Sequence, residues 1–157
     1  MCGFHPIARI KRAAIKKIEL SGGGRDAVTA TANAAKPDEL ALENVPEKRL
    51  PDTFKVGRLA TLIANFAFQD VRKRSKPADD PRRMVADVEG GLRFVVTEVG
   101  EPAQGWVQIS VEATDDAERE KASAIAAKVD GFDFRLPVDR TEILGWANAE
   151  LTTEQKS

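Results

Sequence analysis

The sequence has few of the side chains that most often carry out chemistry. Its 157 residues include one cysteine, Cys2, one histidine, His5, and no tyrosine. A single cysteine excludes a disulfide within the chain. A metal site needs three or four donors, and a catalytic nucleophile needs an oriented base, so Cys2 and His5 alone supply neither. We therefore expect no metal, no cofactor and no catalytic residue, and we interpret the N-terminal residues as inert.

The chain also lacks a strong net charge and long apolar runs. Lysine and arginine number 24 against 25 acidic residues, so the formal charge is -1 and no general field attracts nucleic acid or an anionic membrane. Apolar runs such as residues 62–64 and 94–96 are far shorter than the roughly 20 residues of a spanning helix. The basic N-terminal residues are not followed by the apolar segment of a signal peptide. We predict no nucleic-acid binding, no membrane span and no signal peptide.

What is present is typical of a globular protein: 42% hydrophobic and 31% charged residues. The length fits a single domain over residues 1–157. Two halves, 13–71 and 84–151, are separated by residues 72–83, which are polar and contain two prolines. We interpret this segment as a solvated linker.

The first half predicts a meander of three short strands and then a helix. Hydrophobic residues alternate with polar ones at 13–20, 28–32 and 40–42. The glycine run 22–24 lies between the first two of these strands and closes a hairpin. A phosphate-binding loop is the alternative, but such loops lead from a strand into a helix. Asp52 or Thr53 caps a helix whose apolar residues recur at spacings of three and four as far as Phe66, and an extended segment follows.

The second half predicts a hairpin at residues 84–99 around Gly90 and Gly91. A strand at 106–113 follows, then a helix from about Thr114 to Gly131, a strand at 132–136, and a helix over 139–151. In the 132–136 strand, Phe132, Phe134 and Leu136 should face the core. Together these elements predict an α+β fold, with an antiparallel sheet of about six to seven strands and three helices packed mainly on one face.

Several packing motifs are shared with a known family. They are Gly91-Leu92-Arg93-Phe94, Gly105-Trp106-Val107, residues 124–131 and residues 132–137, with Ile15-Lys16-Lys17-Ile18 and residues 59–71 upstream. On these motifs, residues 84–151 above all resemble a bacterial family catalogued as domain of unknown function 4340. Members often look membrane-anchored at the N-terminus, with the domain outside the cytoplasm, and some accompany gliding-type ABC transport components. The resemblance implies an accessory or binding role and a periplasmic or envelope-associated setting, although we expect no anchor in this chain.

Surface contact is the function that the residues favour. Trp106 and Trp146 are the aromatic candidates for a partner contact. The face of the 106–113 strand that turns away from the helices should carry a polar surface with one large aromatic side chain, made of Trp106, Gln108, Ser110 and the neighbouring Arg93. We expect a protein partner or a second copy of the chain to bind there.

Two alternatives remain open. The first is a hydrolase-like enzyme that assembles carboxylates from distant loops, for which Asp79–Asp80 and Asp115–Asp116 are adjacent acidic pairs. The second is an anionic-polymer binder that uses the basic residues of segment 72–83. The acidic pairs are also explained by helix capping and loop solvation. The basic segment has no aromatic residues between its charges for base stacking.

Overall fold

The structure of the chain is a computed structural model. It describes residues 5–8, 14–22, 27–32, 40–43, 45, 48–59, 66–68, 70–76, 81–89, 91–99, 105–136, 142–145 and 151–154. The strands are β1 (His5–Ala8), β2 (Ile15–Ser21), β3 (Val28–Ala32), β4 (Leu40–Leu42), β5 (Arg49–Pro51), β6 (Phe66–Phe68), β7 (Asp70–Lys73), β8 (Arg83–Val88), β9 (Leu92–Glu98), β10 (Trp106–Ala113), β11 (Phe132–Arg135) and β12 (Thr152–Glu154). The helices are α1 (Thr53–Arg58) and α2 (Arg119–Val129), and short 3-10 turns lie at Asp116–Glu118 and Glu142–Gly145.

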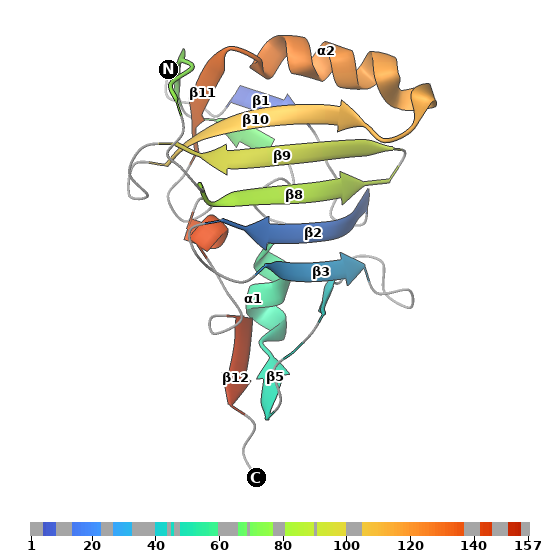
Figure 1. Cartoon of the computed structure of the whole chain (residues 1–157), viewed down its shortest axis with the longest axis vertical. Coiled ribbons are helices and arrows are strands. Elements are labelled where there is room, and N and C mark those ends of the chain that lie inside the picture. The colour runs from blue at the N-terminus through green and yellow to red at the C-terminus, as the bar shows by residue number, and fades with distance from the viewer. Residues whose placement is uncertain are drawn as a thin grey trace.

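Eight strands form one antiparallel sheet in the order β4-β3-β2-β8-β9-β10-β11-β7 (Figure 1). The predicted meander is confirmed as β2, β3 and β4, and the predicted hairpin as β8 and β9. The glycine run leads into strand β3, as a hairpin requires and a phosphate loop does not. Two further pairs, β1 with β6 and β5 with β12, lie outside the main sheet. The α+β prediction with a large antiparallel sheet is therefore correct.

The predicted number of strands and the extent of the helices need correction. The sheet has eight strands because Asp70–Lys73, which reaches into the predicted linker, pairs with β11 at the sheet edge. Asp52 caps α1 by accepting a hydrogen bond from the Lys55 N–H at 3.1 Å, but α1 ends at Arg58 and Phe66 lies in a strand. Of the third predicted helix, over residues 139–151, the structure describes the 3-10 turn Glu142–Gly145 and the helical Leu151, and the rest lies outside the described residues.

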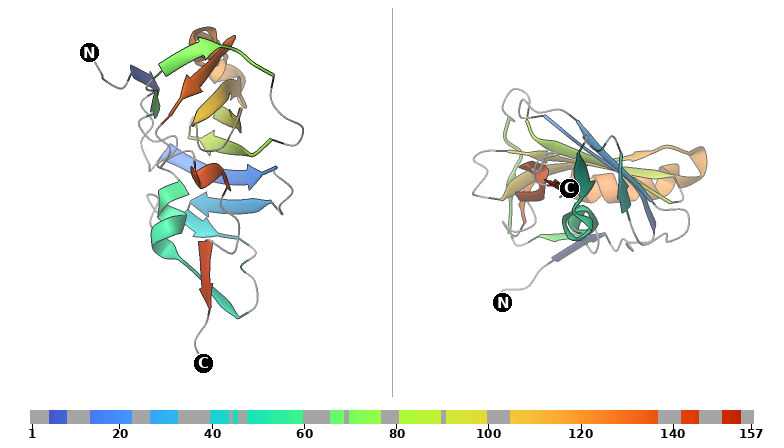
Figure 2. Two further views of the ribbon diagram at one scale, coloured as in Figure 1. Left: turned by 90° about the vertical axis from the view of Figure 1, so that its left-hand side faces the viewer. Right: turned by 90° about the horizontal axis from the view of Figure 1, so that it is seen from below.

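The core lies on one face of the sheet, the covered face. Register pairs such as Ile18 with Ala86 and Ala86 with Phe94 place alternate residues of neighbouring strands on the same side. These side chains form one buried cluster with residues of both helices, including Val56 of α1 and Val129 of α2. Figure 2 shows α1 and α2 on this same side of the sheet.

Two glycines with positive φ allow a matched test of how the β2–β3 hairpin packs. Gly22 has φ +86°, and a Cβ added there would lie 1.9 Å from the carbonyl oxygen of Pro81. Gly131 has φ +85°, but an added Cβ would meet no atom within 4 Å. We expect Gly131→Ala to cost about 1 kcal/mol for the left-handed backbone, and Gly22→Ala about 2–4 kcal/mol because a clash is added. Urea unfolding of both variants measures the difference, and equal losses would contradict the close approach of Gly22 to Pro81.

Candidate functional site

The opposite side of the sheet, the open face, is where the alternation places the polar side chains. Figure 1 looks onto it, with α1 and β1 behind the sheet. The open face includes half-buried or exposed side chains of five strands: Lys17, Glu19, Arg83, Val85, Asp87, Arg93, Val95, Thr97, Trp106, Ser110, Glu112 and Arg135. The two valines lie at its centre, directly opposite each other on β8 and β9. The open face is therefore a polar surface with a small apolar centre.

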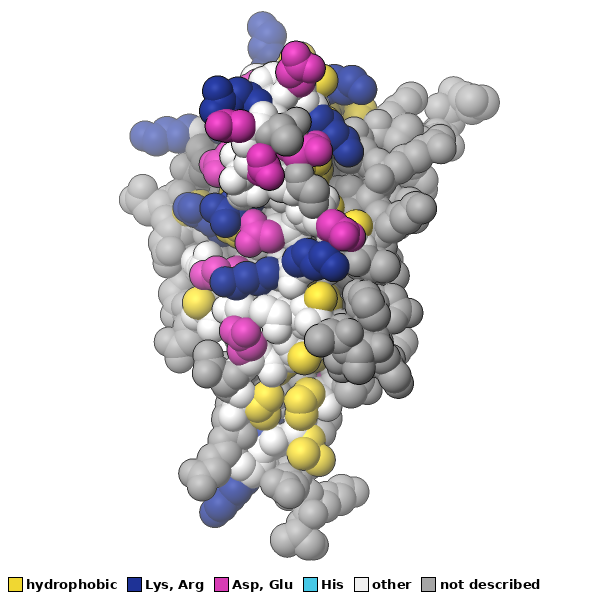
Figure 3. All heavy atoms as spheres, turned by 90° about the vertical axis from the view of Figure 1, so that its right-hand side faces the viewer, with side chains coloured by type: hydrophobic (Ala, Val, Ile, Leu, Met, Phe, Trp, Pro, Cys, Tyr) yellow, Lys and Arg dark blue, Asp and Glu magenta, His cyan; other side chains and the backbone are white. Residues whose placement is uncertain are grey.

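A row of alternating charges crosses one end of the open face. Lys17 lies opposite Asp87, Asp87 opposite Arg93, and Arg93 opposite Glu112, on four successive strands. The Nε of Arg93 donates to Oδ1 of Asp87 at 2.7 Å, and this hydrogen bond, together with the charge of Asp87, raises the pKa of Arg93. Figure 3 looks at this end of the molecule, where acidic and basic side chains lie close together, while hydrophobic ones gather lower, at the level of β4 and β5. The row carries both signs in equal number, so it can contact a partner of mixed charge.

The structure places three of the four predicted site residues on this surface, with Trp106 at one end and Arg93, opposite Glu112, at the other. Trp106 and Ser110 lie on β10 and Arg93 lies on β9, all on the open face, and β9 pairs antiparallel with β10. Gln108 shares their side of the strand and lies opposite Thr97, but it is buried. Gln108 is therefore not part of the surface, and its amide turns to a neighbour within the protein.

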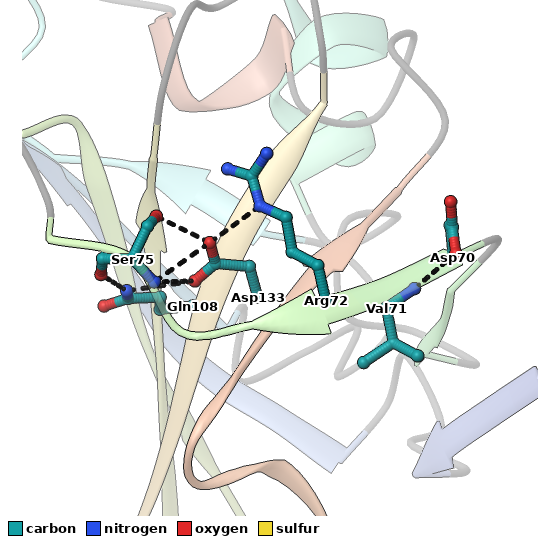
Figure 4. A network of polar contacts seen from close by, with 6 residues as sticks. All are labelled: Asp70, Val71, Arg72, Ser75, Gln108 and Asp133. Atoms are coloured by element: carbon teal, nitrogen blue, oxygen red, sulfur yellow. Dashed lines mark hydrogen bonds and ion pairs between the residues drawn. The ribbon is translucent and has the colours of Figure 1, made fainter.

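That neighbour is Asp133 of β11, whose carboxylate is fully buried (Figure 4). Ser75 donates to Asp133 twice over, through its hydroxyl at 2.6 Å to Oδ2 and through its backbone N–H at 3.3 Å to both oxygens. Nε2 of Gln108 donates to Oδ1 at 3.0 Å and also to the backbone carbonyl of Ser75. Nε of Arg72 donates to Oδ2 at 3.0 Å. Through these hydrogen bonds the Asp133 carboxylate, on β11, connects Ser75 after β7 with Gln108 of β10.

The donors around Asp133 decide its charge. Burial on its own raises the pKa of this carboxyl group, because it disfavours the charged form. The hydrogen bonds from Ser75, Gln108 and Arg72 outweigh burial and leave the pKa of Asp133 below its ordinary value. Asp133 is therefore ionised at neutral pH and acts as an acceptor for its four donors.

Arg72 also lies against Trp106 of the open face. The guanidinium carbon of Arg72 lies 4.2 Å from the centroid of the Trp106 ring, a cation–π arrangement. Its Nε is held by Asp133, so the buried carboxylate fixes the arginine that lies against the half-buried tryptophan. Trp106 is thus held in place at one end of the open face, which suits a preformed contact surface better than a mobile one.

Sequence reasoning missed this network. It placed Phe132, Phe134 and Leu136 toward the core, which leaves Asp133 on the opposite side of the strand, and it assigned residues 72–83 to a solvated linker. Asp133 does point away from the core, as the alternation requires, but β7 and Ser75 cover it. In the same strand Phe134 is buried as predicted, whereas Phe132 is 41% exposed because it lies near the edge. Arg72 and Ser75 are far from Asp133 in the sequence and reach it only because β7 pairs with β11. Their spacing in the sequence therefore does not predict the contact.

The remaining sequence candidates lie in the other parts of the chain. Cys2, Asp79, Asp80 and Trp146 lie outside the described residues, and His5 lies in β1 with its side chain undescribed. Asp116 forms an exposed ion pair with Arg119 at the start of α2. Among the residues whose positions are given, no three of His, Cys, Asp or Glu gather as metal ligands would. Within the same residues, no helix has the length and apolar character needed to cross a bilayer.

Comparisons with known protein families, with curated proteins and with solved structures found no match for this chain. The resemblance of residues 84–151 to the bacterial domain family stays a prediction.

Proposed function

We propose that this chain is a non-enzymatic binding or scaffold domain whose working surface is the open face of the sheet. The observation that carries the proposal is the contrast between the two faces. One is covered by helices over a continuous apolar core, while the other carries a half-buried tryptophan, two central valines and a row of mixed charges. A surface that combines an aromatic side chain with apolar and charged groups has the composition found at protein interfaces.

The partner class follows from the same surface. Charges of both signs and a tryptophan fit a protein partner or a second copy of this chain better than a uniformly charged polymer. The resemblance to the bacterial domain family adds a setting, as an accessory component of an envelope or transport assembly. We carry that setting forward as part of the proposal.

The two alternatives have less support. For a hydrolase, Ser75 and Asp133 are the described hydroxyl and carboxylate in contact, but a carboxylate with a lowered pKa is a weak general base. For an anionic polymer, Arg72, Lys73, Arg74 and Lys76 are all exposed in and after β7. Arg72 already forms an ion pair with Asp133, which lowers the net positive charge of these four residues.

Binding to heparin that is abolished by moderate salt would favour the anionic-polymer alternative.

Trp106→Ala tests the binding proposal. We expect it to weaken retention of a specific protein, or self-association, while destabilising the fold by only about 1–2 kcal/mol, because the ring is half-buried under Arg72. Pull-down from the native source and sedimentation velocity measure binding, and urea unfolding measures stability.

Phe132→Ala is the matched control. Phe132 is also a partly exposed aromatic residue at this end of the sheet, but it lies on the covered side, beside Phe134. It should leave binding unchanged. Equal loss of binding in both variants would contradict the assignment to the open face. So would a loss of binding that is fully explained by a loss of folded protein.

A further inference from the structure

The outer edge of the main sheet has a specific backbone orientation. Among the described residues β7 is its last strand, and the N–H of Arg74 donates to the carbonyl of Gly131 at 3.0 Å. In an antiparallel ladder alternate residues turn their backbone groups to the same side. The backbone groups of Arg72 therefore face β11, and those of Val71 and Lys73 face outward.

The outward N–H of Val71 already has an acceptor within its own chain. Oδ1 of Asp70 accepts from it at 2.8 Å, at an exposed position (Figure 4). A strand that adds to β7 must take this same N–H for its own carbonyl. The carboxylate of Asp70 therefore occupies the first hydrogen-bonding position that such a strand would use.

We propose that the outer edge of β7 is a strand-addition surface for β7 of a second copy of this chain, and that Asp70 keeps this surface closed. The edge pairs through backbone groups of β7 and not through the side chains of the open face, so the inference goes beyond the proposed function. When the carboxylate is removed, two copies pair edge to edge about a two-fold axis.

The charges of β7 select one register for that pairing. Outward residues must face outward residues, so the two-fold axis can pass through Val71, through Arg72 or through Lys73. An axis at Arg72 sets two arginines against each other, and an axis at Lys73 sets two lysines against each other. An axis at Val71 sets the two valines together and residue 70 opposite Arg72 of the second copy, with no like charges opposed.

Apolar surface at this edge favours the same register. Val71 and Phe132 are 44% and 41% exposed, and each is a large hydrophobic side chain. Val71 lies opposite Phe134 in the ladder, and Phe132 makes an edge contact with the Phe134 ring, with centroids 6.4 Å apart. Pairing through Val71 would cover the exposed valine of each copy.

Three variants test the inference, with sedimentation velocity of the full chain as the readout. Asp70→Ala should lower the dimer dissociation constant roughly tenfold, because two exposed hydrogen bonds to charged acceptors no longer compete. Asp70→Asn should behave like the wild type, because its amide oxygen can still accept from Val71. Asp70→Ala with Val71→Pro should be monomeric, because proline lacks the outward N–H and leaves the ladder to β11 intact.

Circular dichroism checks that each variant folds. If the proline variant does not, Asp70→Ala with Val71→Lys replaces it, since two lysines would then face each other at the axis. Asp70→Ala that sediments like the wild type would overturn the inference. So would a dimer that persists in the proline or lysine variant, or a wild-type dimer that Val71→Pro alone dissociates.

Discussion

Replacement of Asp133 by alanine should destabilise the chain by about 3 kcal/mol, because several buried or partly buried donors would lose the acceptor that they share. The N–H of Ser75 and the amide of Gln108 would lose their acceptor, and Arg72 would lose its hold beside Trp106. Urea unfolding at neutral pH measures the loss. Ser110→Ala, on the same face but outside this network, is the control and should stay within about 0.5 kcal/mol of the wild type.

The acid dependence of stability should change in the same variant. The pKa of Asp133 is lower in the folded chain than in the unfolded one, because its donors outweigh its burial. Its stabilising contribution is therefore complete above the unfolded pKa and is lost as the pH falls from about 5 through the folded pKa. In Asp133→Ala this part of the acid loss should be absent, so the two proteins should converge in stability at low pH. A constant difference between them down to about pH 2 would contradict the role of ionised Asp133.

Replacement of Phe134 by alanine should destabilise the chain by about 3–5 kcal/mol. Its ring is 3% exposed and lies 4.8 Å from the Phe68 ring, centroid to centroid, on the covered face. Phe132→Ala, two residues away in the same strand, should cost less than half as much because Phe132 is 41% exposed. Thermal or urea unfolding compares the two, and equal losses would mean that the ring of Phe134 is not in the core.

Local patterns predicted most of the sheet. Alternation and glycine-containing turns located β2, β3, β8, β9 and β10, because residue parity and turn chemistry are local properties. The same alternation placed Trp106, Ser110 and Arg93 on one face before their pairing was known. Helix lengths were predicted less well: apolar spacing continued to Phe66, but tertiary pairing with β1 places Phe66 in β6.

The edge of the sheet and the buried network could not be predicted in this way. The second half of β7, Arg72 and Lys73, was assigned to a polar linker, because an edge strand in water carries charged side chains on both of its faces. Asp133 reads as solvated because its donors come from residues 25 to 61 positions away in the chain. Gln108 was assigned to the surface for the same reason, since alternation gives its face but not what covers that face.

Photo-cross-linking from the open face tests the central claim most directly. A photoreactive residue at position 110, on the open face, is compared with one at position 123, an exposed serine on α2, in cells of the native source. The binding proposal predicts a discrete adduct, with another protein or with a second copy, from position 110 and not from position 123. Adducts from position 123 alone, or from neither position, would contradict a binding role for the open face.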